Sequence, residues 1–201
     1  MLRLGLTGGI ATGKSTVAAM LRELGFDVLD ADSLGHKLIQ PGEPAYDEIL
    51  RDFGAPILDT DNRINRAKLA DIVFADPAKL ARLNAILHPR VKTIIHQQFA
   101  DWSRNGTRDA AFVEAALLVE AGYHKDLDSL VVTWCRPEQQ LERLRARGST
   151  DEDARQRIGA QLPAAEKLSL ATETIDCSGS LEDTRKQVEA LASKLRRPTL
   201  K

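Results

Sequence analysis

Short apolar runs alternate with longer amphipathic segments along most of the chain. The short runs are bounded by glycine or polar residues, which is typical of buried strands, and they cover residues 2–7, 26–30, 110–114, 129–135 and 174–177. The amphipathic segments space their apolar side chains three and four apart, which predicts helices over residues 14–24, 33–40, 137–147 and 181–195. This alternation predicts an α/β fold with a parallel sheet.

Turn-forming residues mark where these elements begin and end. Gly25 and Gly148 end two of the helices, and the sequence PGEP at residues 41–44 breaks a third. The sequence STDE at residues 149–152 is a capping box that opens another helix. Residues 163–167 and 178–180 are expected to be loops.

The region from residue 45 to residue 104 has a different texture, because helical patterns follow one another without a strand between them. Asp76-Pro77 is expected to start one helix and His88-Pro89 another. We interpret residues 41–105 as a helical insert that binds an acceptor, carried on a nucleotide-binding core formed by residues 1–40 and 106–201.

Composition and charge limit the possible partners. The chain has 201 residues, a net charge of -1 and a pI near 6.4, so no global basic field would attract nucleic acid or a membrane surface. Neither a secretory leader nor an apolar run long enough to span a bilayer is recognisable. Two cysteines, Cys135 and Cys177, are expected to be reduced thiols in a cytoplasmic protein.

Residues 8–15, GGIATGKS, match the Walker A pattern G-x-x-x-x-G-K-[ST] between a predicted strand and a predicted helix. Glycines let the loop wrap a phosphate with its N–H groups, and the helix N-terminus favours the anion. Lys14 is expected on the β- and γ-phosphates, Ser15 on Mg²⁺ and Thr16 on the α-phosphate. The expected ATP-binding residues of the loop are Gly8, Gly9, Ala11, Thr12, Gly13, Lys14, Ser15 and Thr16.

A phosphate-binding loop does not by itself define a reaction. A guanine-reading N-K-x-D motif is missing from the sequence, and a large motor would need a longer chain. A small phosphotransferase and a nucleotide-binding module without turnover remain as possibilities.

Carboxylates stand at the ends of the second and third predicted strands, residues 26–30 and 110–114. In LDAD, residues 29–32, an extended backbone would project Asp30 and Asp32 from one face. Asp32 is therefore a candidate general base. Alternatively, Asp32 would cap the helix that follows. Glu114 ends an apolar strand and would hold Mg²⁺ through water, or would be an ordinary charge at the end of a strand.

Arginines are concentrated between residues 138 and 165. Two arginine-bearing helices joined at Gly148 are typical of a lid that closes over phosphates, and we call residues 138–165 the lid segment. The candidates for phosphate contact are Arg143, Arg147 and Arg157, and the first two are also candidates for catalysis. Arg145 is instead expected to pair with nearby carboxylates. The four histidines have no convincing metal-ligand spacing.

Taken together, these motifs make the chain resemble the dephospho-coenzyme A kinase family over nearly all of its length. Beyond the Walker A loop and DAD at residues 30–32, the resemblance rests on INRAKLADIVFADPAKLARLNAILHPRV at 64–91, LLVEAG at 117–122, QQLERLRAR at 139–147, RIGAQ at 157–161 and IDCSGSLEDT at 175–184.

The resemblance implies an ATP-binding core of P-loop type, a helical acceptor domain and a lid. It also implies transfer of the γ-phosphate of ATP, with Mg²⁺, to the ribose 3′-hydroxyl of dephospho-CoA. By this similarity the residues around the acceptor are Asp32, Arg66, Phe74, His88, Pro89, Leu117, Leu118 and Glu120.

The chain departs from the family's pattern at several positions. The family usually has Asp-x-Pro-Leu-Leu-Phe-Glu where residues 114–120 read EAALLVE, and Ala-Asp where Thr172-Glu173 stand. Cys177 replaces an Asn near the adenine site, and Ala11-Thr12 replace Gly-Ser. A different small-metabolite or nucleoside monophosphate kinase is the neighbouring hypothesis, and a monomer or small homo-oligomer is expected.

Overall fold

The structure, a computed structural model, describes residues 1–105 and 109–196. Its contacts divide the chain into two compact units. One combines Met1–Asp30 with Gln98–Lys201, and the other is Ala31–Gln97.

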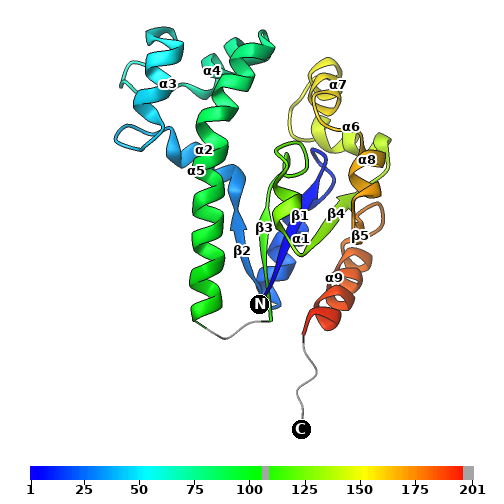
Figure 1. Cartoon of the computed structure of the whole chain (residues 1–201). Helices are drawn as coiled ribbons and strands as arrows, with labels where there is room; N and C mark the ends of the chain where they lie inside the picture. The colour runs from blue at the N-terminus through cyan, green and yellow to red at the C-terminus, as the bar shows by residue number, and fades with distance from the viewer. Residues whose placement is uncertain (106–108, 197–201) are drawn as a thin grey trace. The chain divides into compact units, whose positions relative to one another are not determined.

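A five-stranded parallel sheet forms the centre of the first unit, in the order β2-β3-β1-β4-β5 (Figure 1). The strands are β1 (Leu2–Gly8), β2 (Asp27–Asp30), β3 (Ala110–Glu114), β4 (Ser129–Trp134) and β5 (Glu173–Asp176). The predicted α/β class and parallel sheet are therefore confirmed.

The strand order creates a switch point between β1 and β3. The chain leaves β1 for β2 in one direction and leaves β3 for β4 in the other, although β1 and β3 are neighbours. Ligands of open parallel sheets bind beyond the carboxyl ends of the strands at such a point. The Walker A loop follows β1 and Glu114 ends β3, so both lie at this point.

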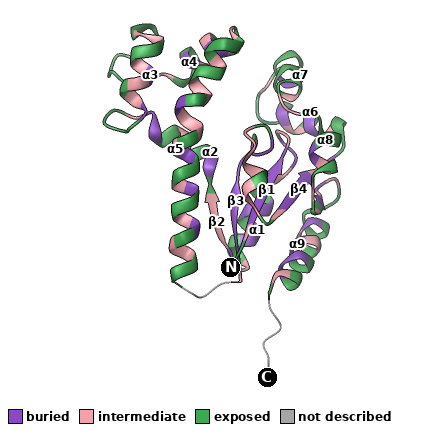
Figure 2. Cartoon of the chain, in the orientation of Figure 1, coloured by how far each residue is buried: buried purple, intermediate pink, exposed green. Residues whose placement is uncertain are grey.

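Helices α1 (Lys14–Glu23) and α9 (Leu181–Leu195) cover one face of the sheet and contact each other. Leu4 and Leu6 of β1 share this face because strand side chains alternate, and they pack with Leu21 of α1 and Val188 of α9. Figure 2 shows β3 and β4 as buried, whereas β2 is only half-buried.

The lid segment contains α6 (Pro137–Arg145) and α7 (Asp151–Gly159). The expected capping box at Ser149 is displaced by one residue: Thr150 is the N-cap, and its hydroxyl accepts a hydrogen bond from the Asp153 N–H at 3.2 Å. The loop expected at residues 163–167 is wrong, because α8 (Ala164–Ser169) begins there. Pro163 stands before the first turn, where a missing N–H is tolerated, and Lys167 buries its side chain.

The second unit is helical, as the sequence predicts for much of it. It contains α2 (Ala31–Leu38), α3 (Tyr46–Phe53), the 3₁₀ turn η1 (Ala55–Ile57), α4 (Arg66–Phe74) and most of α5 (Pro77–Arg104). Glu48 of α3 accepts a hydrogen bond from Arg90 of α5 at 2.7 Å, which joins these two helices.

The prediction that a helix starts at His88-Pro89 is wrong, since Pro89 lies inside the continuous helix α5. Proline lacks the N–H that would bond to the carbonyl four residues earlier and usually interrupts a helix. Here neighbouring side chains bond to the backbone in this turn: Arg90 donates to the carbonyl oxygen of Ile86 at 2.6 Å, and Thr93 donates to that of Pro89 at 2.9 Å.

Within the described residues, no helix combines the length and the apolar character needed to cross a membrane.

Candidate active site

The Walker A loop connects β1 to α1, as its sequence requires, and glycine is needed at two of its positions. A Cβ on Gly8 would lie 2.1 Å from the Thr133 hydroxyl oxygen, and one on Gly13 would lie 2.8 Å from the Cys177 sulfur. Gly13 also has a φ of 104°, which residues with a Cβ rarely adopt. These glycines therefore allow the loop to lie directly on β4 and on the residue after β5.

The loop is fastened from within by Thr12. Its hydroxyl donates to the carbonyl oxygen of Gly9 at 2.8 Å and lies 2.9 Å from the hydroxyl of Thr133, and its N–H donates to the same Gly9 carbonyl at 3.2 Å. The Thr12 side chain is buried. Its contribution to the site is therefore to hold the shape of the loop.

Helix α1 begins at Lys14 and presents its N-terminus where the loop ends. Ser15 and Thr16 are exposed in the first turn, which contains no acidic residue. The first N–H groups of a helix have no partner within the helix, and the helix dipole favours a negative charge there. This end of α1 can therefore receive an anion.

Lys14 forms an ion pair with Glu114 at the end of β3, with Nζ and Oε1 2.9 Å apart. The other carboxylate oxygen, Oε2, lies 3.4 Å from a guanidinium nitrogen of Arg22. Glu114 is 4% exposed, so both cations share a buried negative charge. The structure thus brings the predicted loop lysine and the predicted strand-end carboxylate into direct contact.

Of the three candidate arginines in the lid segment, Arg143 lies against the loop. Its guanidinium donates to the carbonyl oxygen of Ala11 at 3.1 Å and to that of Cys177 at 2.6 Å. Arg147 and Arg157 are exposed. Arg145 bonds to Asp151 at 2.6 Å, which confirms the expected surface pair, and this contact lowers the pKa of the Asp151 carboxyl.

Two glutamines of the lid segment contact the loop and were missed among the predicted site residues. Gln140 donates from Nε2 to the carbonyl oxygen of Ile10 at 2.8 Å, and the Ile10 N–H donates to Oε1 of Gln161 at 2.7 Å. Gln140 is buried and shares a helix face with Leu144, four residues later. A polar residue on an apolar helix face needs a partner, and this is the signal that would have identified Gln140.

A family model described as dephospho-CoA kinase (CoaE) matches residues 2–183. The chain belongs to the dephospho-CoA kinase family. A dephospho-CoA kinase of Aquifex aeolicus is 44% identical over 198 residues, covering 98% of this chain and 99% of the relative. One of Geobacillus kaustophilus is 44% identical over 191 residues, covering 94% of both chains.

Solved structures agree with this family. The crystal structure of TT1252 from Thermus thermophilus has a TM-score of 0.83 at 34% identity and covers 98% of both chains. The dephospho-CoA kinase of Campylobacter jejuni has a TM-score of 0.72 at 27% identity and covers 96% of both chains. A shikimate kinase of Acinetobacter baumannii, with a TM-score of 0.52 at 17% identity, shares the fold alone. The protein is thus a kinase on a P-loop kinase fold.

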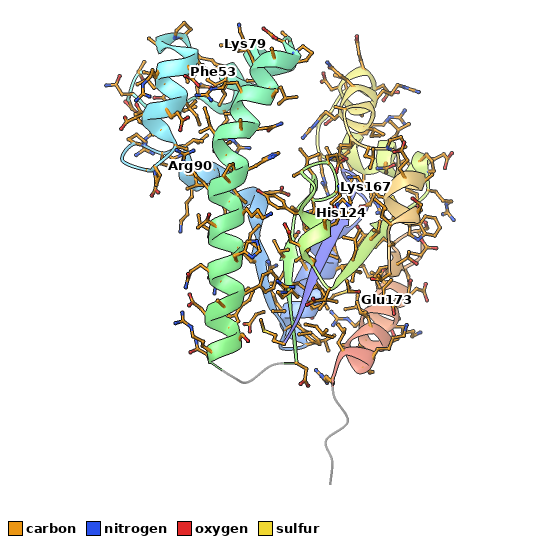
Figure 3. All side chains as sticks on the ribbon, in the orientation of Figure 1. Phe53, Lys79, Arg90, His124, Lys167 and Glu173 are labelled. Carbon is orange, nitrogen blue, oxygen red and sulfur yellow. The ribbon has the colours of Figure 1, made fainter. Side chains whose placement is uncertain are left out.

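In this dephospho-CoA kinase family member, the segment after β3 carries three of the predicted acceptor residues. Leu118 is buried and Leu117 is 49% exposed. The Glu120 carboxylate oxygen Oε1 lies 2.8 Å from Nζ of Lys167, and it accepts a hydrogen bond from the Leu162 N–H at 3.0 Å. Lys167 is buried and donates to the Ala116 carbonyl oxygen at 2.8 Å, so it anchors this segment to α8 (Figure 3).

The remaining predicted acceptor residues belong to the second unit. Asp32 is exposed in the first turn of α2. β2 ends at Asp30, as predicted, and α2 begins at Ala31, so an extended backbone does not place Asp30 and Asp32 on one face. Arg66 is the exposed first residue of α4, which Asn65 caps.

His88 is half-buried in α5, and burial lowers the pKa of its imidazole. Pro89 is exposed, and Phe74 ends α4 with a side chain outside the described part of the structure.

Cys177, which the resemblance leads us to expect near the adenine site, is buried in the core cluster below the loop. Burial raises the pKa of its thiol to about 11 and also raises that of the Cys135 thiol. Both cysteines are free. Because the sulfur of Cys177 faces Gly13 and the core, a contact with an adenine would involve the backbone at this position.

Proposed function

We propose that the protein transfers the γ-phosphate of ATP to the ribose 3′-hydroxyl of dephospho-CoA, giving CoA and ADP. The observation that carries the proposal is the Walker A loop at the switch point of a parallel sheet, in a chain that belongs to this family. In phosphoryl transfer the protein mainly positions the reactants and stabilises charge.

The nucleotide side of the proposed reaction uses the loop, α1 and the lid segment. N–H groups of the loop and the N-terminus of α1 would bind the phosphates, and Lys14 would neutralise charge on the β- and γ-phosphates. Arg143 already lies against the loop, and Arg147 and Arg157 are exposed cations on the same segment. Cys177 would border the nucleotide through its backbone.

Mg²⁺ would be held chiefly by the nucleotide. The described residues contain no group of three or more histidine, cysteine or acidic side chains able to hold a metal ion. Mg²⁺ usually keeps several waters and binds through one or two protein groups and substrate phosphates. The exposed Ser15 hydroxyl would be its ligand, and Glu114, which already pairs with Lys14, would act through water. The ion would neutralise charge on the transferred phosphoryl group.

The acceptor side uses Asp32 as the general base. Its carboxylate would take the proton of the ribose 3′-hydroxyl as that oxygen bonds to the γ-phosphorus and the bond to ADP breaks. Arg66, Phe74, His88, Pro89, Leu117, Leu118 and Glu120 would surround the acceptor. A monomer or small homo-oligomer in the cytoplasm remains part of this proposal and rests on the sequence.

The test is ADP release in a coupled assay with ATP, Mg²⁺ and dephospho-CoA, with AMP, CMP, shikimate and pantothenate as parallel acceptors. We expect turnover with dephospho-CoA, a product heavier by one phosphate, and no turnover with Lys14→Ala. Turnover with another acceptor alone would contradict the acceptor assignment. Bound ATP without turnover on any acceptor would favour a regulatory nucleotide-binding module.

A further inference from the structure

The first half of the Walker A loop is held by side chains of the lid segment. Both backbone polar groups of Ile10 are bonded to glutamines: the carbonyl oxygen accepts from Gln140, and the N–H donates to Gln161. Because a carbonyl accepts and an N–H donates, the backbone fixes the orientation of both side-chain amides. If Gly9 carried a Cβ, this atom would lie 3.1 Å from the amide nitrogen of Gln140 and 3.6 Å from the amide oxygen of Gln161. The two side chains therefore cover the same point of the loop.

The next residue of the loop has an unfavourable backbone conformation. Ala11 has a φ of 61°, in the left-handed region that residues with a Cβ rarely adopt. Such a conformation persists where surrounding contacts determine it. Those contacts come from the lid segment: Arg143 donates to the Ala11 carbonyl oxygen, and Leu144 and Ala154 pack against its methyl group.

The end of the lid segment is anchored in turn to the segment after β3. Leu162 follows Gln161 directly, and its N–H donates to Glu120, which pairs with the buried Lys167. Gln161 therefore extends from a fixed point in the protein. Its amide can act as a rigid support for Ile10.

From these contacts we infer that Gln140 and Gln161 are positioning residues, which fix the Walker A loop in its phosphate-binding shape and make ATP affinity depend on the lid segment. Gln140 acts as a donor and Gln161 as an acceptor toward one backbone residue. This inference rests on the proposed binding of ATP by the loop, and it does not depend on which acceptor is used.

The opposite roles of the two glutamines give a matched test. Gln161→Glu keeps an acceptor for the Ile10 N–H, whereas Gln140→Glu removes the donor and places a carboxylate against the Ile10 carbonyl. Both substitutions add the same charge close to Gly9, so repulsion of the phosphates affects the two variants similarly. Their difference reports the hydrogen bonds.

ATP binding is measured by calorimetry on the full chain with Mg²⁺ and without acceptor. We expect the added charge to weaken ATP binding in both variants, and Gln140→Glu to bind about tenfold or more weakly than Gln161→Glu, the effect of one buried hydrogen bond lost. The KM for ATP should rise in Gln140→Glu while the KM for the acceptor stays unchanged. Equal affinities, or the reverse order, would overturn the inference.

Thermal melting separates this role from a general loss of folding, since partial unfolding lowers the active fraction and kcat without raising the KM for ATP. If Gln140→Glu does not fold, Gln140→Met replaces it, because methionine removes the donor without adding a charge. An unsubstituted protein that binds ATP but does not phosphorylate dephospho-CoA would contradict the proposed function and leave this comparison intact. An unsubstituted protein that does not bind ATP would overturn both.

Discussion

Lys14 and Glu114 form an ion pair of 2.9 Å whose side chains are only 12% and 5% exposed. The two residues are one hundred positions apart and meet because β1 and β3 are neighbours in the sheet. Glu114 therefore orients the lysine of the phosphate-binding loop, in addition to its proposed action on Mg²⁺ through water.

Replacing Glu114 by Gln should lower both stability and activity. Lys14 would lose the partner of a nearly buried charge, which typically lowers the free energy of unfolding by about 3 kcal/mol, and a misplaced Lys14 would reduce kcat/KM by about tenfold to a hundredfold. Urea unfolding and the coupled assay measure the two effects. The matched control is Arg22→Gln, which removes the more exposed partner of the same carboxylate and should change stability by less than about 1 kcal/mol. Equal losses in the two variants would contradict the role given to Lys14.

Replacing Asp32 by Asn should reduce kcat by about 10²- to 10⁴-fold, the usual contribution of a general base, and leave ATP affinity nearly unchanged. Single-turnover measurements and calorimetry separate the two quantities. Asp47→Asn is the control, because Asp47 is also an exposed carboxylate in the first turn of a helix, α3, and has no assigned role. It should retain normal turnover. Full turnover of Asp32→Asn would show that Asp32 is not the general base and that its charge only stabilises the N-terminus of α2.

Asp128 should make a small part of the stability dependent on pH. It accepts hydrogen bonds from the Arg3 guanidinium at 3.1 Å and from the Arg3 backbone N–H at 2.8 Å, and these bonds lower the pKa of its carboxyl below the unfolded value. The stabilisation is complete above the unfolded pKa of about 3.9 and is lost as the pH falls through the lower folded pKa.

The difference in free energy of unfolding between the unsubstituted protein and Asp128→Asn measures this contribution. It should be about 1 kcal/mol or less near neutral pH, because the pair is 39% and 35% exposed, and it should approach zero as the pH falls from about 5 to about 2. A difference that grows toward acid pH would show that the sign is wrong.

The Cys177 thiol should be unreactive in the folded protein. With a pKa of about 11, only about one thiol in a thousand is ionised at pH 8, and the sulfur is also buried. A chromogenic disulfide reagent should therefore react with it only after unfolding in guanidinium. Cys135→Ala leaves Cys177 as the single thiol, so the reaction can be assigned. Rapid reaction of the folded protein would mean that the loop opens away from β5.

Local sequence determined the phosphate-binding loop and the elements around it. The pattern of residues 8–15 specifies which positions need glycine and where the lysine and hydroxyl lie, because the chemistry is contained in eight consecutive residues. Apolar runs predicted the parallel strands, since strands buried on both faces are apolar throughout. Residue spacing also led to Arg145 as a surface residue that pairs with Asp151. The expectation that Arg143 and Arg147 share one helix is wrong, because α6 ends at Arg145 and Arg147 lies in the turn that follows.

Contacts between distant segments were decided only by the tertiary structure. The pairing of Lys14 with Glu114 depends on strand order, and the support of Ile10 by Gln140 and Gln161 depends on how the lid segment packs on the loop. Pro89 was expected to begin a helix because proline disfavours helix interiors, yet α5 continues through it. The preference of one proline against a helix interior amounts to a few kcal/mol, and the packing energy summed over a long helix exceeds this cost. Residue type and spacing therefore identified the chemistry of the loop, while burial and strand order determined which side chains hold it in place.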